Sequence, residues 1–251
     1  MPFTIRKTIA IIALPFTVII GFGALSTFII FLYTGPFNWV KLGINEEQGL
    51  MLNTLLSLIF FLQHSGMVRR EFRRRMQNII PPHYHGAVYT IVSGLVLFVF
   101  LIFWQSSENM LLDVQGLPAI IMRSFFFLAI LGTCWGMWAL RSVDMFGLDA
   151  VVKNQKDKQS DSKTFTVRGP YRWVRHPLYL FTIVLFWSYP SISADRLLLN
   201  VLWTIWIVIG ATLEERELID DFGDDYRDYQ ANVPMLLPRT FHPVYPDANL
   251  K

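Results

Sequence analysis

The chain has 251 residues, of which 53% are hydrophobic and only 16% are charged, and its mean hydropathy is +0.39. Soluble globular domains carry about 25% charged residues, so this composition excludes an ordinary soluble enzyme. The formal net charge of +3 gives no reason to expect nucleic acid as a partner, and the single cysteine, Cys134, excludes an intramolecular disulfide.

Six apolar segments without charged residues follow one another along the chain. They are residues 8–33, 50–61, 86–104, 124–140, 178–189 and 197–213. A spanning helix needs about 17–25 apolar residues. The first, third, fourth and sixth segments reach this length by themselves, whereas the second and fifth need flanking residues to cross. The sequence therefore predicts an all-α, polytopic transmembrane helix bundle of about six spans.

Basic residues fix the predicted orientation, because loops rich in Lys and Arg stay in the cytoplasm. When both termini are placed inside, only three basic residues fall on the outer side: Lys41, Arg123 and Arg196. The sequence therefore predicts a multi-pass protein whose N- and C-termini are cytoplasmic.

The second apolar segment ends in polar residues. Gln63 and His64 come first, and a run of arginines follows at residues 69–75. For the arginines we favour attraction to anionic lipid headgroups. Gln63 and His64 are either a polar cap on the span or part of a site, where we place them as substrate residues.

The densest group of polar and aromatic side chains is residues 168–179. A Gly-Pro pair marks a turn, and Pro177 suits the first turn of a helix. Arg175 and His176 then lie at the cytoplasmic end of the fifth span. A membrane-interface anchor explains basic and aromatic residues here, but it does not explain three arginines, a histidine and two tyrosines around two prolines.

A pair of carboxylates, Glu214 and Glu215, directly follows the sixth apolar segment. The fifth and sixth spans have similar lengths at 1.5 Å per residue, so a hairpin brings these carboxylates to the depth of Arg175 and His176. Carboxylates at a membrane edge are costly unless they are solvated or paired. The pattern predicts either an interfacial salt bridge or one corner of a shared site.

The tail after these glutamates is acidic and aromatic. Spacing predicts an interfacial helix over residues 217–229, with recurring apolar positions at Leu218, Phe222, Tyr226 and Tyr229. Packing is the simpler interpretation of that stripe. Residues 233–238 would then fold back as an apolar lid or interface segment.

A cytoplasmic pocket built from arginine, histidine, carboxylates and tyrosines suits an aromatic zwitterion such as S-adenosylmethionine. Its carboxylate matches a guanidinium, its ammonium matches a glutamate, and its adenine and sulfonium match aromatic faces. Composition alone leaves a phosphate- or nucleotide-binding membrane enzyme open. We expect no metal, since His83 and His85 have no Cys or carboxylate at ligand spacing.

Residues 168–179 resemble the signature of the isoprenylcysteine carboxyl methyltransferase superfamily, a Gly-Pro-Tyr followed by Arg-His-Pro-x-Tyr. The two neighbouring glutamates and residues 218–238 are similar to its C-terminal half. Residues 61–65 and 81–89 are similar to the bacterial methanethiol S-methyltransferases and the related NnrU-like proteins. In the superfamily, the Arg-His-Pro and Glu-Glu motifs form the S-adenosylmethionine site.

We assign catalytic roles to Arg175, His176 and Glu215. Cofactor binding is assigned to a wider set. It contains the residues that the resemblance implies, their neighbours within residues 168–179, and two tyrosines of the predicted helix over residues 217–229: Gly169, Pro170, Tyr171, Arg175, His176, Tyr179, Glu214, Glu215, Tyr226 and Tyr229. Two positions depart from the superfamily. Phe181 stands where a Gly is common, which would narrow the channel beside the cofactor, and His85-Gly86 stands where a charged pair is expected.

These assignments divide the chain in two: residues 1–145 as an N-terminal bundle of four spans, and residues 146–251 as the cofactor-binding loop, helical hairpin and interfacial helix. The resemblance implies methyl transfer from S-adenosylmethionine to a small apolar thiol, methanethiol giving dimethyl sulfide, in a bacterial inner membrane. A thiolate is already a good nucleophile. The alternatives are a carboxyl or lipid-headgroup methyltransferase of the isoprenylcysteine methyltransferase type, or a non-catalytic NnrU-like membrane protein.

Overall fold

The computed structural model describes residues 3–140 and 165–246, which fold as two compact units. The first unit comprises residues 3–107, and the second comprises residues 108–140 and 165–246. Five helices are long and apolar enough to cross a membrane, and a sixth apolar helix is shorter, so the prediction of an all-α membrane protein is confirmed. The proposed division at residues 145 and 146, and the polar loop around it, lie outside the described residues.

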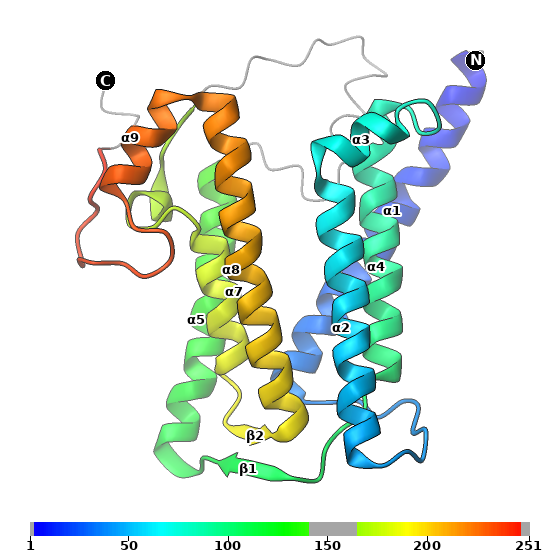
Figure 1. Ribbon diagram of the computed structural model, residues 1–251, viewed down its shortest axis with the longest axis vertical. Coiled ribbons are helices and arrows are strands. Elements are labelled where there is room, and N and C mark those ends of the chain that lie inside the picture. Colours follow the sequence, from blue (N-terminus) through cyan, green and yellow to red (C-terminus); the bar gives the residue numbers. More distant parts are fainter. Residues whose placement is uncertain (1–2, 141–164, 247–251) are drawn as a thin grey trace. The chain divides into compact units, whose positions relative to one another are not determined.

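All the regular elements of the first unit are helices (Figure 1). Its elements are α1 (Phe3–Thr34), α2 (Glu46–Val68), α3 (Arg70–Met76), the 3-10 helix η1 (Pro82–Tyr84) and α4 (His85–Phe103). The second predicted span, residues 50–61, is part of the 23-residue helix α2, whose N-terminus lies at Glu46 because a capping box at Asn45 begins the helix there. Asn45 accepts from the Gln48 backbone N–H at 2.9 Å, and the Gln48 side chain accepts from Asn45 N–H at 3.2 Å.

Helix α4 packs against both α1 and α2. Aromatic rings fill the α1–α4 contact, where Phe31 meets Phe100 and Trp104 edge to face with centroids 6.2 and 5.9 Å apart. On the α2 side, the buried Asn53 side chain donates to the Gln105 carbonyl at 2.7 Å and accepts from its N–H at 2.9 Å. One amide thus satisfies the backbone just after α4 and fixes α2 beside it.

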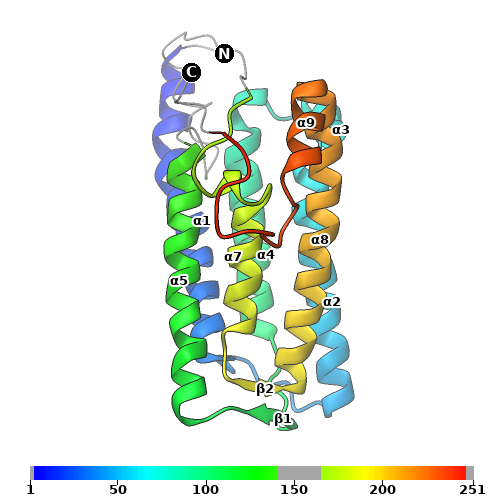
Figure 2. The same ribbon diagram turned by 90° about the vertical axis from the view of Figure 1, so that its left-hand side faces the viewer.

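The second unit contains the two predicted C-terminal spans (Figure 2). Its elements are β1 (Met110–Asp113), α5 (Gly116–Leu140), η2 (Gly169–Arg172), α7 (Pro177–Trp187), β2 (Ser191–Ser193), α8 (Ala194–Phe222) and α9 (Asp224–Asn232). Helix α7 packs against both α5 and α8. The two short strands, which the sequence did not predict, pair antiparallel at the end of the unit where α5 and α8 begin.

Two predicted helices differ from the observed ones. Helix α7 has 11 residues, about 16 Å at 1.5 Å per residue, and is too short to cross a bilayer core alone. The single helix predicted over residues 217–229 is wrong, because Gly223 divides it with a φ of +57°. Only glycine adopts such a backbone readily, so α8 ends at Phe222 and the chain turns into α9.

Helices α5 and α7 approach closely through two glycines of α5. A Cβ added to Gly132 would lie 2.5 Å from the ring of Phe181, and one added to Gly136 would lie 2.7 Å from Leu178. Small residues one turn apart allow such packing between membrane helices. The glycines therefore set the position of α7, and with it the position of the residues at its N-terminus.

We expect Gly132→Ala to destabilise the protein, because overpacking a tight contact costs about 1–3 kcal/mol. The measurement is the midpoint of thermal unfolding in detergent. Gly210→Ala is the matched control, since a Cβ there meets nothing within 4 Å, and it should leave the midpoint unchanged. Adding Phe181→Ala to Gly132→Ala should recover part of the loss. Equal midpoints for the two glycine variants would contradict the close packing.

Candidate active site

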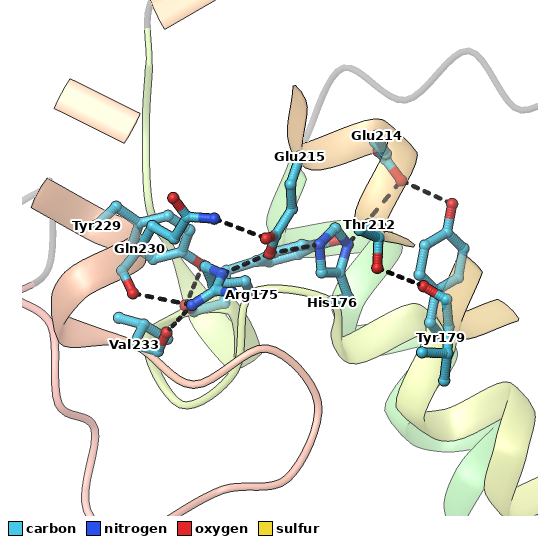
Figure 3. A network of polar contacts seen from close by, with 11 residues as sticks. Arg175, His176, Tyr179, Thr212, Glu214, Glu215, Tyr229, Gln230 and Val233 are labelled. Atoms are coloured by element: carbon cyan, nitrogen blue, oxygen red, sulfur yellow. Dashed lines mark hydrogen bonds and ion pairs between the residues drawn. The ribbon is translucent and has the colours of Figure 1, made fainter. Parts of the chain in front are cut away.

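The two motifs of the C-terminal half meet at one end of the α7–α8 hairpin. Pro177 is the first residue of α7, so Arg175 and His176 directly precede that helix. Glu214 and Glu215 lie two turns before the end of α8. The hairpin prediction is confirmed, because the two pairs are within hydrogen-bonding distance of each other (Figure 3).

Arg175 is the centre of the polar network. Its Nε donates to Glu215 Oε1 at 2.6 Å, and its Nη1 donates to the carbonyl oxygens of Gln230, at 2.9 Å, and Val233. The side chains of Arg175 and Glu215 are only 10% and 9% exposed. An ion pair removed from water in this way is strongly directional. Arg175 therefore joins the start of α7 to α8, to α9 and to the residue after α9.

His176 and Tyr179 form the second part of the network. His176 is buried, and its Nε2 donates to Glu215 Oε1 at 3.1 Å. Its ring stacks on Tyr179 with the centroids 5.3 Å apart, and the Tyr179 hydroxyl donates to Glu214 Oε2 at 2.7 Å. Glu215 is therefore bonded to Arg175 and His176, and Glu214 to Tyr179. His176 Nδ1 also lies 3.9 Å from Glu214 Oε2, so the imidazole contacts both carboxylates.

The chain after α9 closes against the start of α7. The Arg175 N–H donates to the Pro234 carbonyl at 2.9 Å, and the His176 N–H donates to the Met235 carbonyl at 3.0 Å. Val233 is buried. The prediction that residues 233–238 fold back is confirmed for this part, and the contact supplies partners for two backbone donors that precede the helix.

Gln230 belongs to the network and was missed by sequence reasoning. Its Nε2 donates to Glu215 Oε2 at 2.8 Å, while its carbonyl accepts from Arg175. The residue lies in a short acidic helix, and nothing in its sequence context distinguishes it from a solvated surface glutamine. Only the turn at Gly223 brings it back to Glu215.

We expect Gln230→Glu to be more damaging than Gln230→Ala. Alanine loses one hydrogen bond to a carboxylate, worth about 1.5–3 kcal/mol at most, whereas glutamate places a second negative charge beside Glu215. Neither change removes the backbone carbonyl that Arg175 uses. Thermal unfolding measured at pH 7 orders the variants, and a glutamate variant as stable as wild type would show that this contact does not form.

A cavity of about 460 Å³ lies beside this network. That volume falls in the range of about 300–1,000 Å³ found for small-molecule and cofactor sites. Its walls are formed by α5, α7, α8, α9 and the segment before η2, through Leu140, Phe165, Thr166, Val167, Tyr171, Arg175, His176, Leu178, Tyr179, Glu214, Leu218, Phe222, Tyr226 and Tyr229.

Three of the tyrosines that line this cavity, Tyr171, Tyr226 and Tyr229, are held as neutral phenols. Burial raises the pKa of Tyr171, and the nearby Glu214 carboxylate raises it further. Burial and the Glu215 carboxylate raise the pKa of Tyr226, and burial raises that of Tyr229. Each hydroxyl therefore remains a hydrogen-bond donor at physiological pH, and Tyr229 uses its proton to bond the Tyr171 carbonyl at 2.6 Å.

The predicted aromatic stripe both packs and lines the cavity. Tyr226 and Tyr229 are 2% and 3% exposed and pack with Val167 and Val233. The same two tyrosines, with Leu218 and Phe222, face the cavity. The same buried rings of Tyr226 and Tyr229 therefore pack in the core and form an aromatic wall of the cavity.

Most of the residues predicted to bind a cofactor come together around the cavity: Tyr171, Arg175, His176, Tyr179, Glu214, Tyr226 and Tyr229 line it. Glu215 is not among the lining residues and lies behind Arg175 and His176. Gly169 and Pro170 do not line the cavity either. Gly169 has a φ of +52° and faces Ala139 and Trp135 of α5, so it fixes the turn that presents Tyr171.

Phe181 does not line this cavity, and a narrowing of a channel beside the cofactor stays a prediction. The Phe181 ring packs on Gly132 of α5 and is absent from the cavity lining. It lies one turn beyond Pro177 on the face of α7 turned toward α5. The side chain that replaces the family's glycine is therefore a helix-packing residue in this chain.

The predicted substrate residues Gln63 and His64 lie in the first unit. Gln63 donates to Ser93 Oγ at 3.0 Å and to the Met67 sulfur at 3.2 Å. The His64 ring is 2.8 Å, at its nearest nitrogen, from the Tyr89 hydroxyl. These contacts join α2 to α4, and a role for either residue toward a substrate stays a prediction.

Chemically, the cavity offers a guanidinium, two carboxylates at or behind its wall and several phenols and rings. The chemistry of such a set suits an aromatic molecule that carries both charges. Within the described residues, no group of three or more His, Cys, Asp or Glu side chains is placed to hold a metal ion. The recognisable ligand chemistry of the cavity is that of organic ions.

Comparison with known proteins places these observations in a family. Residues 119–225, from α5 to the start of α9, match the family described as phospholipid methyltransferase. A methanethiol S-methyltransferase from a Pseudomonas species is 31% identical over 78% of this chain and 76% of its own length. One from Mycobacterium tuberculosis is 31% identical over 76% of this chain and 79% of its own.

A more distant relative acts on a different acceptor. The human protein-S-isoprenylcysteine O-methyltransferase is 31% identical over 61% of this chain, but the match covers only 52% of the human protein. No solved structure matches the chain. Both kinds of relative are methyltransferases, but one is named for transfer to sulfur and the other for transfer to oxygen.

Proposed function

The chain belongs to the family of membrane methyltransferases that includes the methanethiol S-methyltransferases, and we propose that it transfers a methyl group from S-adenosylmethionine to a small apolar thiol, with methanethiol giving dimethyl sulfide. When bound, S-adenosylmethionine supplies a methyl carbon to which the thiolate sulfur bonds as the carbon–sulfonium bond breaks and its electron pair stays on the departing thioether. The observation that supports the cofactor assignment is that a guanidinium, a carboxylate and several aromatic rings line the same 460 Å³ cavity.

The residues of the cavity fit this cofactor group by group. One guanidinium and two carboxylates leave a net negative charge, which complements a ligand that carries two positive groups and one carboxylate. Glu214 is 45% exposed on its side chain and lines the cavity, so it is available to an ammonium group. Arg175 commits Nε and Nη1 to the protein, and in this proposal its Nη2 bonds the ligand carboxylate.

Aromatic residues would hold the rest of the cofactor. Tyr226, Tyr229 and Phe222 offer faces for an adenine ring, and Tyr171 and Tyr179 offer electron-rich faces to a sulfonium. In this proposal His176 and Arg175 favour the thiolate form of the acceptor. A thiolate needs no strong base, so alignment with the methyl carbon and exclusion of water supply most of the rate.

The test uses the purified full-length chain with methyl-labelled S-adenosylmethionine and methanethiol. Labelled dimethyl sulfide is expected, together with cofactor binding in calorimetric titration. Absence of both the product and the binding would overturn the proposal. A farnesylated cysteine substrate is offered in parallel, because the human relative acts on isoprenylcysteine, and methylation of that substrate alone would replace the thiol by a carboxylate acceptor.

For the setting of this site, we propose a bacterial inner membrane with both termini in the cytoplasm. The support is the asymmetry of basic residues between the predicted loops, together with the bacterial origin of the methanethiol S-methyltransferases named above. Cysteine accessibility labelling checks the orientation: a cysteine introduced at Lys41 should react with an impermeant reagent in intact cells, and one at Arg227 should not.

A further inference from the structure

A second cavity, of about 530 Å³, lies in the first unit where α2 ends and α4 begins. None of the described residues that line it also lines the 460 Å³ cavity. The residues around it are Met67, Val68, Arg70, Arg73, Arg74, Gln77, Pro82, His85, Gly86 and Tyr89. Among these described residues three are arginines and none is acidic, so this part of the lining is positively charged.

The charges around this cavity are not cancelled by the helix that supplies them. Helix α3 contains one acidic residue, Glu71, whose carboxylate oxygens pair with Arg74 and Arg75, each at 2.9 Å. Arg75 does not line the cavity, whereas Arg70, Arg73 and Arg74 do. The described lining residues and α3 together therefore carry more positive than negative charge.

The position of the cavity selects the kind of anion. It lies at the ends of two helices that are long and apolar enough to span a membrane, α2 and the segment Pro82–Phe103. Apolar side chains at the same level are exposed, with Val68 at 43% and Ile79 at 74%. Guanidiniums beside exposed apolar residues at the end of a span lie at the depth of lipid headgroups, and basic pockets between membrane helices suit phosphate-bearing headgroups.

We propose that this cavity binds the phosphodiester headgroup of an anionic phospholipid, with Arg70, Arg73 and Arg74 as its ligands. The acyl chains would extend along the apolar surfaces of α2 and α4. The polar inner wall is formed by His85, whose Nε2 donates to the Ile80 carbonyl at 2.7 Å, and by Tyr89, whose hydroxyl is held by His64. All the described residues that line this cavity belong to the first unit.

The experiment measures binding of dioctanoyl phosphatidylglycerol to the full-length chain in neutral detergent, by thermal shift and by native mass spectrometry. Each arginine near the surface contributes about 1 kcal/mol, so Arg73→Gln should weaken binding about fivefold. Arg75→Gln is the matched control. It makes the same charge change two residues further along the same helix but outside the cavity, and should change binding less than twofold.

Two further ligands separate the sources of the anion. Dioctanoyl phosphatidylcholine tests whether net headgroup charge is needed, and inorganic phosphate tests whether the lipid is needed. Selective binding of phosphatidylglycerol that is lost in Arg73→Gln and kept in Arg75→Gln supports the site. Equal loss in the two variants, equal binding of phosphatidylcholine, or binding of phosphate without the lipid would each overturn it.

Discussion

Replacement of Arg175 by glutamine is expected to abolish cofactor binding and lower stability together. The side chain holds Glu215 at 2.6 Å and also bonds the carbonyls of Gln230 and Val233. Removing one partner of a buried ion pair costs about 3–5 kcal/mol, because the other charge remains buried without compensation. Arg175 is also proposed to meet the ligand carboxylate, and loss of one partner of a buried charge pair in a complex costs about 2–5 kcal/mol. The affinity for S-adenosylmethionine should therefore fall by on the order of 100-fold.

Calorimetry with S-adenosylmethionine and thermal unfolding in detergent measure the two effects. The control is Arg227→Gln in α9, which breaks an exposed pair with Asp224 at 2.9 Å. Exposed pairs contribute about 0–1 kcal/mol, so this variant should bind the cofactor nearly as wild type does. Normal cofactor affinity in Arg175→Gln would contradict the site.

Replacement of the two neighbouring glutamates is expected to give different phenotypes. Glu215 is 9% exposed and accepts from Arg175, His176 and Gln230. Glutamine at this position would direct an NH₂ group at one or more of these donors, so the midpoint of unfolding should fall and activity should be lost. A hydrogen bond to a charged group contributes about 1.5–3 kcal/mol, and at least one such bond is broken.

Glu214→Gln should instead leave the unfolding midpoint unchanged and weaken cofactor binding by about tenfold. This is the lower end of the range for a hydrogen bond to a charged group, because the carboxylate is partly exposed to water. A carbonyl oxygen remains to accept from Tyr179, so the local contact is kept while the charge is removed. The matched pair distinguishes a residue that positions Arg175 from one that meets the ligand. If Glu214→Gln lowered the unfolding midpoint as much as Glu215→Gln, this division of roles would be wrong.

Much of the site was predictable because its two motifs sit at fixed distances from membrane spans. Pro177 starts α7 as its missing N–H requires, and α8 returns far enough to carry Glu215 back to Arg175. Two helices joined by a short connection must run antiparallel, so residues near their far ends meet. The hairpin therefore follows from segment length and helix rise alone.

Other features depended on contacts that no local pattern encodes. Gln230 reaches Glu215 because Gly223 turns the chain between α8 and α9. Phe181 faces α5 because Gly132 leaves room for its ring. In each case the partner lies on another helix, and its side-chain size or backbone angle decides the contact.

The sequence by itself determined that this chain crosses a membrane and that an arginine–histidine pair and a glutamate pair share one end of a hairpin, because apolar length and helical rise are properties of continuous segments. The tertiary structure alone decided which glutamate faces the cavity. Glu214 and Glu215 are neighbours that point about 100° apart around α8. Arg175, just before α7, gives Glu215 an ion pair, whereas Tyr179, on α7, bonds Glu214 at the cavity wall. Only the packing of α7 against α8 decides which glutamate takes which place.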